Sequence, residues 1–424
     1  MNKKLITVAV DLTPVLPGGE NGGAKVLVLE LLNLLAEMQP QTQFILLTQI
    51  GSHDELAYLD RPNMRRYIVL GAPLSDVVET KHPLWRRIAS RVFRCLPATI
   101  RGLVIRFIHQ VIPRPKAGKT ISLLKGLGVQ LLFCPFTSPT YAEPGIASVC
   151  SLYDLQHKTY PQFFTADDVV LRDRIYADTF SCGAALIAIS DYTRASALLH
   201  GNLNSNRIHT IYPRMSQRIR PRGEDDKRIL VKLRLNSQRY FLFPANFWKH
   251  KNHEMLLTAF GIAAHKGLAA DFKLVCTGAP TPRRDELIKA ANVMGLADRV
   301  VFPGYLPNEE LATVMAHTKG VIFPSLYEGF GLPVIEAMAA GVPVACSNTT
   351  SLPEVALDAA ILFDPRVPTQ IAEVLLTLEN NDVLCAKLIQ AGLKRAEEFS
   401  DSRRMAKEYW TLFEGEFFLQ QNTL

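Results

Sequence analysis

The sequence lacks several signatures that would assign it quickly to a class of protein. Its seven cysteines are scattered without a C-x-x-C pair, so we expect buried free thiols in a reducing compartment, not disulfides or a zinc site. No apolar run approaches the ~20 residues of a transmembrane helix, and the apolar start of the chain ends at Asp11, too early for a signal peptide. There is no Asp-x-Asp motif that could hold a metal ion. We therefore expect a cytoplasmic protein.

Acidic residues are missing from one long segment. Between Thr80 and Gln130 the chain has 11 Lys and Arg residues and no Asp or Glu, whereas the net charge of the whole chain is only +7. Apolar residues recur at helical spacing before and after Pro97, with arginines opposite the first set, which predicts two amphipathic helices. Such helices either pack on their own domain or bind an anionic membrane surface.

Trp and Phe residues opposite a basic face favour the membrane, which would make the protein peripheral on the inner face of the plasma membrane. Nucleic acid is disfavoured as a partner, because no recognised binding motif accompanies the basic segment. The residues expected to contact the membrane are Trp85, Arg86, Arg87, Arg91, Arg94, Arg101 and Arg106.

The stretch from Pro324 to Gly341 carries the strongest functional signal. The apolar residues Val321–Phe323 predict a buried strand, a Gly-Phe-Gly turn follows, and Pro333 suits the start of a helix that Gly341 ends. The backbone N–H groups of residues 331–334 would then point out of a helix N-terminus, which is a site for a phosphate group.

Two carboxylates, Glu328 and Glu336, flank this predicted phosphate site. In isolation, such a pair would be a solvated loop charge and a partner of the helix dipole. Because a carboxylate repels a phosphate, hydroxyl groups beside the phosphate are the natural targets of both. A phosphate in the middle with a polyol on either side describes a nucleotide sugar.

Together with Ala339–Asn348 and Ser351–Val355, this stretch resembles the donor-site signature of retaining glycosyltransferases of family 4. The resemblance implies that Glu336 holds the ribose hydroxyls and Glu328 the transferred sugar. It also implies that backbone amides contact the sugar and the diphosphate, at Gly329, Phe330, Gly331 and Leu332.

Two further turns resemble parts of the same pattern. Gly22 and Gly23 lie in a glycine turn between a predicted strand and helix, and they match the loop that faces the donor phosphates in the family. Tyr305 lies in a turn that resembles the one that contacts the nucleotide base.

The cationic part of the pattern is only partly present. Lys251 matches a lysine that binds the diphosphate in the family, whereas Asn246 stands near the place of an arginine and cannot supply its charge. We expect Lys249 or His250 to compensate.

The family has His-Asp after a strand of the first domain, and this chain has Tyr153-Asp154. Tyrosine is longer than histidine and stays neutral at pH 7. We therefore expect Tyr153 to select the sugar through packing and one hydrogen bond, without a part in proton transfer, and Asp154 to orient its loop. The candidate catalytic residues are Glu328, Lys251, Tyr153 and Asp154.

Strand-like and helix-like segments alternate along the chain, which predicts an α/β fold with parallel sheets covered on both faces. The resemblance implies the GT-B architecture, in which two doubly wound Rossmann-like domains face each other across a cleft. The expected parts are an acceptor-side domain (1–213) with the basic helical segment (80–128), a linker (214–236), a nucleotide-sugar-binding domain (237–398) and a last helix (399–424) that returns to the first domain.

The resemblance implies a retaining hexosyltransferase. It would move a hexose, with mannose-type or 6-deoxyhexose sugars favoured, from a nucleoside diphosphate sugar to a lipid-linked glycan acceptor in cell-surface polysaccharide synthesis. No metal or other cofactor is expected, since Lys251 and backbone amides can balance the diphosphate charge. Two alternatives stay open: a nucleotide-sugar epimerase on the same architecture, and a non-catalytic protein that binds nucleotide sugar or lipid.

Overall fold

The structure, a computed structural model, describes residues 4–16, 22–70, 122–219 and 227–423 of the chain. The residues predicted to contact a membrane, from Trp85 to Arg106, lie outside these ranges, so their role stays a prediction. In the part that the structure describes, no helix is both long enough and apolar enough to cross a bilayer.

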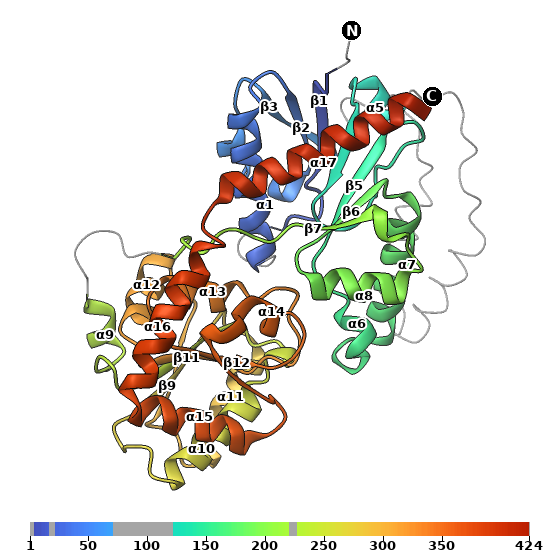
Figure 1. Ribbon diagram of the computed structural model, residues 1–424. Helices are drawn as coiled ribbons and strands as arrows, with labels where there is room; N and C mark the ends of the chain where they lie inside the picture. Colours follow the sequence, from blue (N-terminus) through green and yellow to red (C-terminus); the bar gives the residue numbers. More distant parts are fainter. Residues whose placement is uncertain (1–3, 17–21, 71–121, 220–226, 424) are drawn as a thin grey trace, which may run out of the picture.

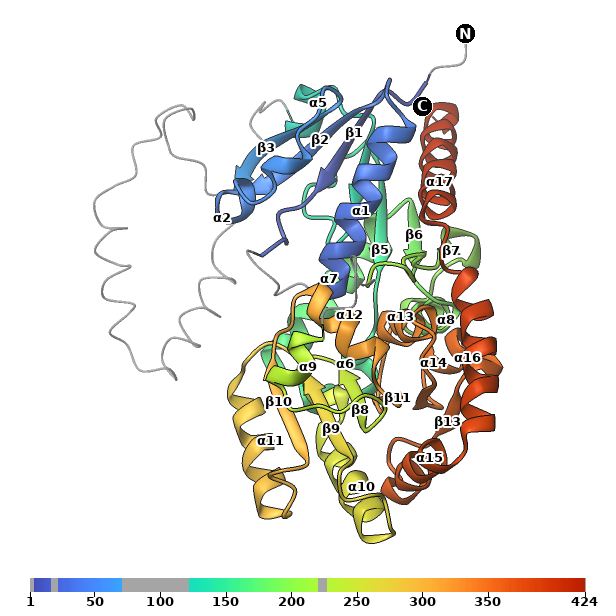
Figure 2. The ribbon, with the colours of Figure 1, turned by 90° about the vertical axis from the view of Figure 1, so that its left-hand side faces the viewer.

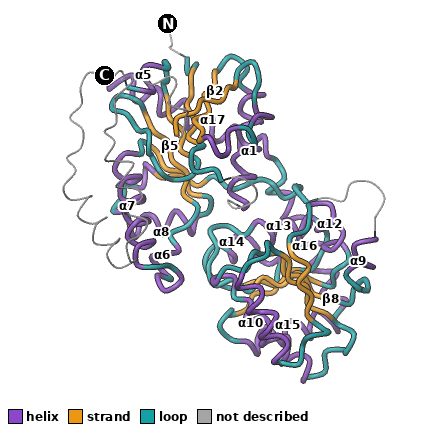
Figure 3. The backbone as a smooth tube through the Cα atoms, turned by 180° about the vertical axis from the view of Figure 1, so that it is seen from behind, coloured by secondary structure: helices purple, strands orange, loops and turns teal. Residues whose placement is uncertain are grey.

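Two parallel sheets, each covered by helices on both faces, form two domains (Figures 1 and 3). This arrangement confirms the predicted α/β fold with two doubly wound domains. Among the described residues the first sheet has seven strands in the order β3-β2-β1-β4-β5-β6-β7. These strands are β1 (Thr7–Asp11), β2 (Gln43–Gln49), β3 (Met64–Leu70), β4 (Leu131–Cys134), β5 (Ala147–Leu152), β6 (Ala185–Ala188) and β7 (Ile208–Thr210).

Both faces of the first sheet are buried, which explains the near-continuous apolar runs of its strands. Val8 and Val10 of β1 pack with α1 (Gly22–Met38) and α17 (Ser402–Thr423). Ala9 between them packs with α5 (Leu123–Gly126), α7 (Ala166–Cys182) and α8 (Asp191–Gly201). The helices of this domain are α1 (Gly22–Met38), α2 (Ile50–His53), η1 (Ala57–Leu59), α5 (Leu123–Gly126), α6 (Gln156–Thr159), η2 (Pro161–Phe163), α7 (Ala166–Cys182), α8 (Asp191–Gly201), η3 (Ser205–Arg207) and α17 (Ser402–Thr423).

The second sheet has six strands in the order β10-β9-β8-β11-β12-β13, again among the described residues. These strands are β8 (Tyr240–Pro244), β9 (Lys273–Thr277), β10 (Val300–Gly304), β11 (Gly320–Phe323), β12 (Val344–Ser347) and β13 (Ile361–Phe363). The helices around it are α9 (Arg228–Lys232), η4 (Lys249–Lys251), α10 (His253–His265), α11 (Pro282–Val293), α12 (Asn308–Ala316), α13 (Leu332–Ala339), α14 (Leu352–Ala356), η5 (Leu357–Ala359), α15 (Pro368–Asn380) and α16 (Asp382–Glu397).

The chain crosses between the domains after β7 and again between α16 and α17 (Figure 1). The two crossings touch, since the backbone N–H of Ser216 donates to the carbonyl of Phe399 at 3.0 Å. After the second crossing, α17 packs against α1 of the first domain (Figures 1 and 2). Part of the segment expected to be a linker instead belongs to the second domain, because Ile229 and Leu230 of α9 are buried in its core.

One carboxylate ties the two domains together beside the site. Glu354 at the start of α14 accepts hydrogen bonds from the backbone N–H groups of Asp191 and Tyr192, each at 2.9 Å. These groups lie at the N-terminus of α8 in the first domain, where a negative charge is stabilising. The contact fixes the end of β6 against the turn that follows β12.

Candidate active site

The turn between β11 and α13 needs glycine at two positions, for two different reasons. Gly331 has a φ of 107°, in the left-handed region, and a Cβ added there would lie 2.6 Å from Leu352 Cδ2. A Cβ added at Gly329 would lie only 1.9 Å from the carbonyl oxygen of Tyr153 in the first domain. The turn is therefore pressed against the end of β5, where an open α/β sheet binds its ligands.

Hydroxyl groups from the segment before α14 hold this turn in place. Thr350 Oγ1 accepts from the backbone N–H of Glu328 at 3.1 Å. The buried Ser351 hydroxyl lies 3.0 Å from the carbonyl oxygens of both Glu328 and Phe330. The backbone on either side of Gly329 is thus fixed, which limits where the Glu328 carboxylate can point.

Replacing Ser351 with alanine is expected to lower the free energy of unfolding by about 1–3 kcal/mol, because buried carbonyl groups lose their donor. Donor affinity should fall as well, since the turn would loosen. Thermal unfolding with and without a nucleotide sugar measures both effects, with Ser400→Ala, a hydroxyl between α16 and α17, as the control. Unchanged stability and unchanged affinity would show that the hydroxyl does not hold the turn.

Lys251 and Glu328 form an ion pair, with Nζ and Oε1 2.6 Å apart, and their side chains are only 12% and 11% exposed. Lys251 is the last residue of η4 and is followed by Asn252, whose φ of 65° suits asparagine. The amide of Asn252 donates to the carbonyl oxygens of Pro324 and Pro365, at 3.0 and 2.8 Å. The cation is therefore placed by a turn that is anchored to the loop after β11.

Glu336 lies on the buried side of α13, with only 1% of its side chain exposed. Its Oε1 accepts from Arg218 Nε at 2.7 Å and from Arg218 Nη2 at 2.6 Å. Burial raises the pKa of the Glu336 carboxyl, and the Arg218 guanidinium opposes that rise. Arg218 belongs to the segment after β7 that the sequence predicts to be a linker, so this contact joins the interdomain crossing to α13.

The two predicted phosphate loops come together. Helix α1 begins at Gly22, whose φ is 55°, and a Cβ added at Gly23 would lie 3.3 Å from Leu332 Cδ1 at the start of α13. Two helix N-termini from different domains thus meet beside the turn that carries Glu328. Helix N-termini stabilise anions, so this junction beside the turn suits a diphosphate.

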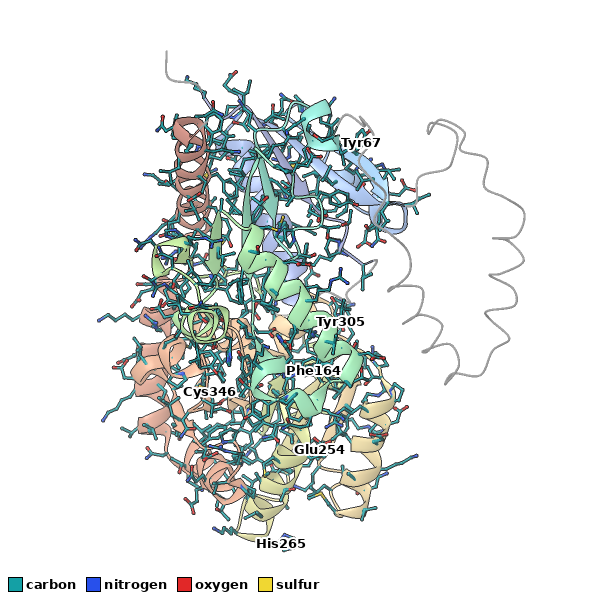
Figure 4. All side chains as sticks on the ribbon, turned by 90° about the vertical axis from the view of Figure 1, so that its right-hand side faces the viewer. Tyr67, Phe164, Glu254, His265, Tyr305 and Cys346 are labelled. Atoms are coloured by element: carbon teal, nitrogen blue, oxygen red, sulfur yellow. The ribbon has the colours of Figure 1, made fainter. Side chains whose placement is uncertain are left out.

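A cleft of about 820 Å³ lies between the domains. It brings together six of the predicted site residues, Asp154, Lys249, His250, Lys251, Glu328 and Gly329. The first domain also contributes Gln156, Phe163, Phe164 and Arg172, and the second Phe247, Trp248, Thr281, Pro282, Arg283, Glu286 and Tyr327. In Figure 4, Phe164 lies at the level where the domains meet, between the labels of Tyr305 and Glu254.

Two residues expected near the diphosphate carry no positive charge. Asn246 Oδ1 accepts from the backbone N–H of Ala279 at 3.0 Å, so this side chain ties the loops after β8 and β9 together. Burial lowers the pKa of His250 to about 2, which leaves the imidazole neutral. His250 therefore cannot supply the compensating charge expected of it, whereas Lys249 is exposed and lines the cleft.

Tyr153 and Asp154 directly follow β5 on the first-domain side of the site. The Tyr153 ring packs against the cores of both domains and is not among the groups that line the cleft. Burial raises its pKa well above the usual value, so the phenol stays neutral. Asp154 Oδ1 accepts from the N–H of Gln156 at 2.9 Å, a local contact that shapes the loop. The sugar-selecting role of Tyr153 stays a prediction, and the geometry around its ring does not add to it.

Tyr305, expected near the nucleotide base, is 67% exposed just after β10 and lies outside the cleft lining (Figure 4).

The Phe330 side chain packs into the protein, away from the predicted donor site. Its ring is buried against Tyr212 and Phe399, so only its backbone faces the site.

Several residues of the site carry no signal that sequence reasoning could use. Arg218 pairs with a glutamate 118 positions away, inside a stretch whose composition indicates a linker. Arg172 lies in the second turn of α7 and Arg283 in the first turn of α11, and only the fold brings these half-buried residues to one cleft. Ser351, by contrast, lies inside the quoted motif, where its spacing from Glu328 gives no hint of a hydrogen bond.

The class of protein follows from the fold, the site and the family comparison. Residues 225–395, which include β8 to β13 and the turn before α13, match the family Glycosyl transferases group 1. The second domain thus matches a family of glycosyltransferases, and the chain as a whole has the GT-B fold.

One similar protein is the O-antigen chain mannosyltransferase B of Escherichia coli, 29% identical over 254 residues. The match covers 60% of this chain and 66% of that protein, just under two thirds of its length. Sucrose-phosphate synthase from Thermosynechococcus elongatus superposes with a TM-score of 0.70 at 17% identity, over 98% of this chain and 100% of that one. The Anabaena protein Alr3699/HepE, solved with UDP and glucose, gives a TM-score of 0.68 at 13% identity, over 96% of this chain and 99% of that one. At these identities the structures show the fold alone.

Proposed function

We propose that this protein transfers a hexose, mannose in the first place, from a nucleoside diphosphate sugar to a glycan acceptor with retention of the anomeric configuration. The observation that carries the proposal is the arrangement around Lys251. Its ion pair with Glu328 lies beside the turn that opens α13, and the N-terminus of α1 meets that turn from the other domain. One cation, one carboxylate and two helix N-termini fit a sugar joined to a diphosphate.

The chain's own residues then have separate tasks in the transfer. The C1–O bond to the diphosphate breaks, and Lys251 and the amides at the start of α13 stabilise the charge that develops on the leaving group. Glu328 accepts hydrogen bonds from the sugar hydroxyls, and Glu336 does so from the ribose. The acceptor hydroxyl forms the new bond to C1 from the side of the leaving group, and its proton goes to the donor phosphate. This sequence of steps rests on the family resemblance.

The far wall of the cleft suits a glycan acceptor. Phe163 and Phe164 of the first domain face the same cavity as Trp248 of the second. Aromatic side chains of this kind present apolar faces to sugar rings, while Arg172, whose guanidinium lies 4.6 Å from the centroid of the Phe164 ring, offers hydrogen-bond donors. The name of the Escherichia coli relative supports both mannose and a polysaccharide product.

A thermal-shift panel tests the donor half of the proposal. A ligand that binds only the folded state stabilises it by mass action, at ten times its Kd by about 1.4 kcal/mol. We expect nucleoside diphosphate sugars, with GDP-mannose first, to raise the unfolding temperature of the wild type. Free mannose at the same concentration serves as the control. If no nucleotide sugar among those with a uracil, guanine, adenine or thymine base raises it, the proposed function is wrong.

A lipid-linked acceptor would explain the basic segment, and this makes a separate prediction. Replacing Arg86, Arg87, Arg91 and Arg94 with glutamine should abolish flotation with anionic liposomes. Each basic residue near such a surface contributes on the order of 1 kcal/mol, and salt screens this attraction. Donor thermal shifts should be unchanged. If the wild type does not float with anionic liposomes at low salt, the segment has no membrane role.

A further inference from the structure

The diphosphate of the proposed donor needs more positive charge than Lys251 alone supplies. Each phosphate of a nucleoside diphosphate sugar carries a negative charge, and a further charge develops when the sugar leaves. Much of the charge of Lys251 is already balanced by Glu328 at 2.6 Å, and Lys249 is exposed in the cleft, whose lining includes no residue of α13. Asn246 is uncharged and is held by Ala279, and His250 is neutral. A further cation beside the start of α13 would balance the charge of the second phosphate.

Arg218 is placed to supply it. Side chains on a helix lean toward the helix N-terminus, so the carboxylate of Glu336 lies over the first turn of α13, which begins at Leu332. Four residues of helix correspond to about 6 Å. The guanidinium that Glu336 holds at 2.6 and 2.7 Å is therefore close to the amides predicted to bind the phosphates.

Arg218 also keeps unused donors. Arginine has five N–H groups in a fixed fork, and Arg218 directs two of its nitrogens to a single oxygen of Glu336. No other partner of this side chain is found among the described residues, and 21% of it is exposed. A guanidinium that is anchored on one edge and open on the other can bind a phosphate without first being ordered, which lowers the entropic cost of binding.

We propose that Arg218 is the second cation of the diphosphate site, supplied by the interdomain crossing and oriented by Glu336. The proposal rests on the proposed function. It makes Glu336 serve two ends of the nucleotide, with one oxygen holding Arg218 and the other free for the ribose hydroxyls. It also places a donor-binding residue on the segment that joins the two domains, so donor binding and the position of this segment become linked.

The competing explanation is that Arg218 only neutralises Glu336, and the choice of ligand separates the two. Calorimetric titration with GDP and UDP, and with guanosine and uridine, gives the contribution of the diphosphate as the ratio of nucleoside Kd to nucleoside diphosphate Kd. In Arg218→Met this ratio should fall roughly ten- to a hundredfold, the range for a lost charge-assisted contact. Arg218→Lys keeps a charge without the fork and should lie between. Arg404→Gln, which removes an exposed arginine of α17, is the matched control and should leave the ratio unchanged.

Each result has one meaning. An unchanged ratio in Arg218→Met, with nucleoside and nucleoside diphosphate weakened alike, restricts Arg218 to positioning Glu336 and overturns the proposal. Tighter binding of the diphosphates in that variant would show that Arg218 blocks the site, which also overturns it. If Arg218→Met does not fold, a full wild-type ratio in Arg218→Lys counts against a phosphate contact, because lysine cannot reproduce the fork. If the wild type binds neither GDP nor UDP, the proposed function fails, and not merely this inference.

Discussion

Replacing Lys251 with alanine is expected to weaken donor binding or turnover roughly ten- to a thousandfold, the range for a charged contact that stabilises a leaving group. The loss should be larger for turnover than for binding, since the negative charge on the diphosphate grows as the sugar departs. Steady-state kinetics with the donor identified by thermal shift measure both. The variant should still fold, because both Lys251 and Glu328 line the cleft, where water can reach the carboxylate once the lysine is removed.

The chain offers a closely matched control for this variant. Lys319 is also 12% exposed and also forms an ion pair at 2.6 Å, with Asp382, but it lies at the opposite end of β11 from the site. Lys319→Ala should therefore keep wild-type kinetics. Equal kinetics in the two alanine variants would contradict the assignment of Lys251 to the diphosphate.

Replacing Glu336 with glutamine is the second change with a large expected effect, again roughly ten- to a thousandfold in donor affinity. Glutamine keeps the size of the side chain but loses the charge that holds Arg218 and that we propose to accept from the ribose hydroxyls. Calorimetry with the nucleoside alone isolates the ribose contact. The control is Glu379→Gln on α15, which removes a carboxylate that accepts from the backbone N–H of Ala269 and does not line the cleft. Wild-type nucleoside affinity in Glu336→Gln would contradict the ribose assignment.

The pH dependence of binding follows from the burial of Glu336. Burial raises the pKa of this carboxyl above its ordinary value, and Arg218 only partly opposes the shift. The ionised form is the one that binds, so donor affinity should fall as the pH is lowered through this raised pKa, at a higher pH than for an exposed glutamate. The acid limb should disappear in Glu336→Gln.

Local signals made the centre of the site predictable from the sequence. The turn before α13 combines a buried strand, glycines that the backbone requires and a proline in the first helical turn, and each is a short-range effect. The structure has the strand at Gly320–Phe323 and the helix at Leu332–Ala339. The apolar runs along the chain predicted two parallel sheets, and this too is a local signal. A strand that is buried on both faces of a sheet has apolar residues at nearly every position.

The sequence could not predict contacts between residues that lie far apart along the chain. The distance between Arg218 and Glu336 along the chain is too great for any pattern, and the composition around Arg218 favoured a linker. The sequence suggested that His250 could carry a positive charge, but burial in the fold lowers its pKa and leaves it neutral. The aromatic wall of Phe164 and Trp248 exists only because the two domains face each other across the cleft.

Two rival functions share this fold, and each makes a different prediction about the donor. A nucleotide-sugar epimerase would isomerise the donor without an acceptor, for which the cleft would need acid and base groups around one sugar carbon. A non-catalytic binding protein would be stabilised by the donor and leave it unchanged. Both would survive the binding experiments above, so only the fate of the sugar separates them from a transferase.

The measurement that tests the central claim most directly is proton NMR of the sugar's anomeric signal during a single reaction. The donor that gives the largest thermal shift is incubated with the wild type, with and without an oligosaccharide acceptor ending in mannose. In the sample with acceptor, we predict release of the nucleoside diphosphate and a new linkage with the anomeric configuration of the donor. In the sample without acceptor, we predict only slow hydrolysis of the donor. An isomerised donor, or a linkage of inverted configuration, would contradict the account.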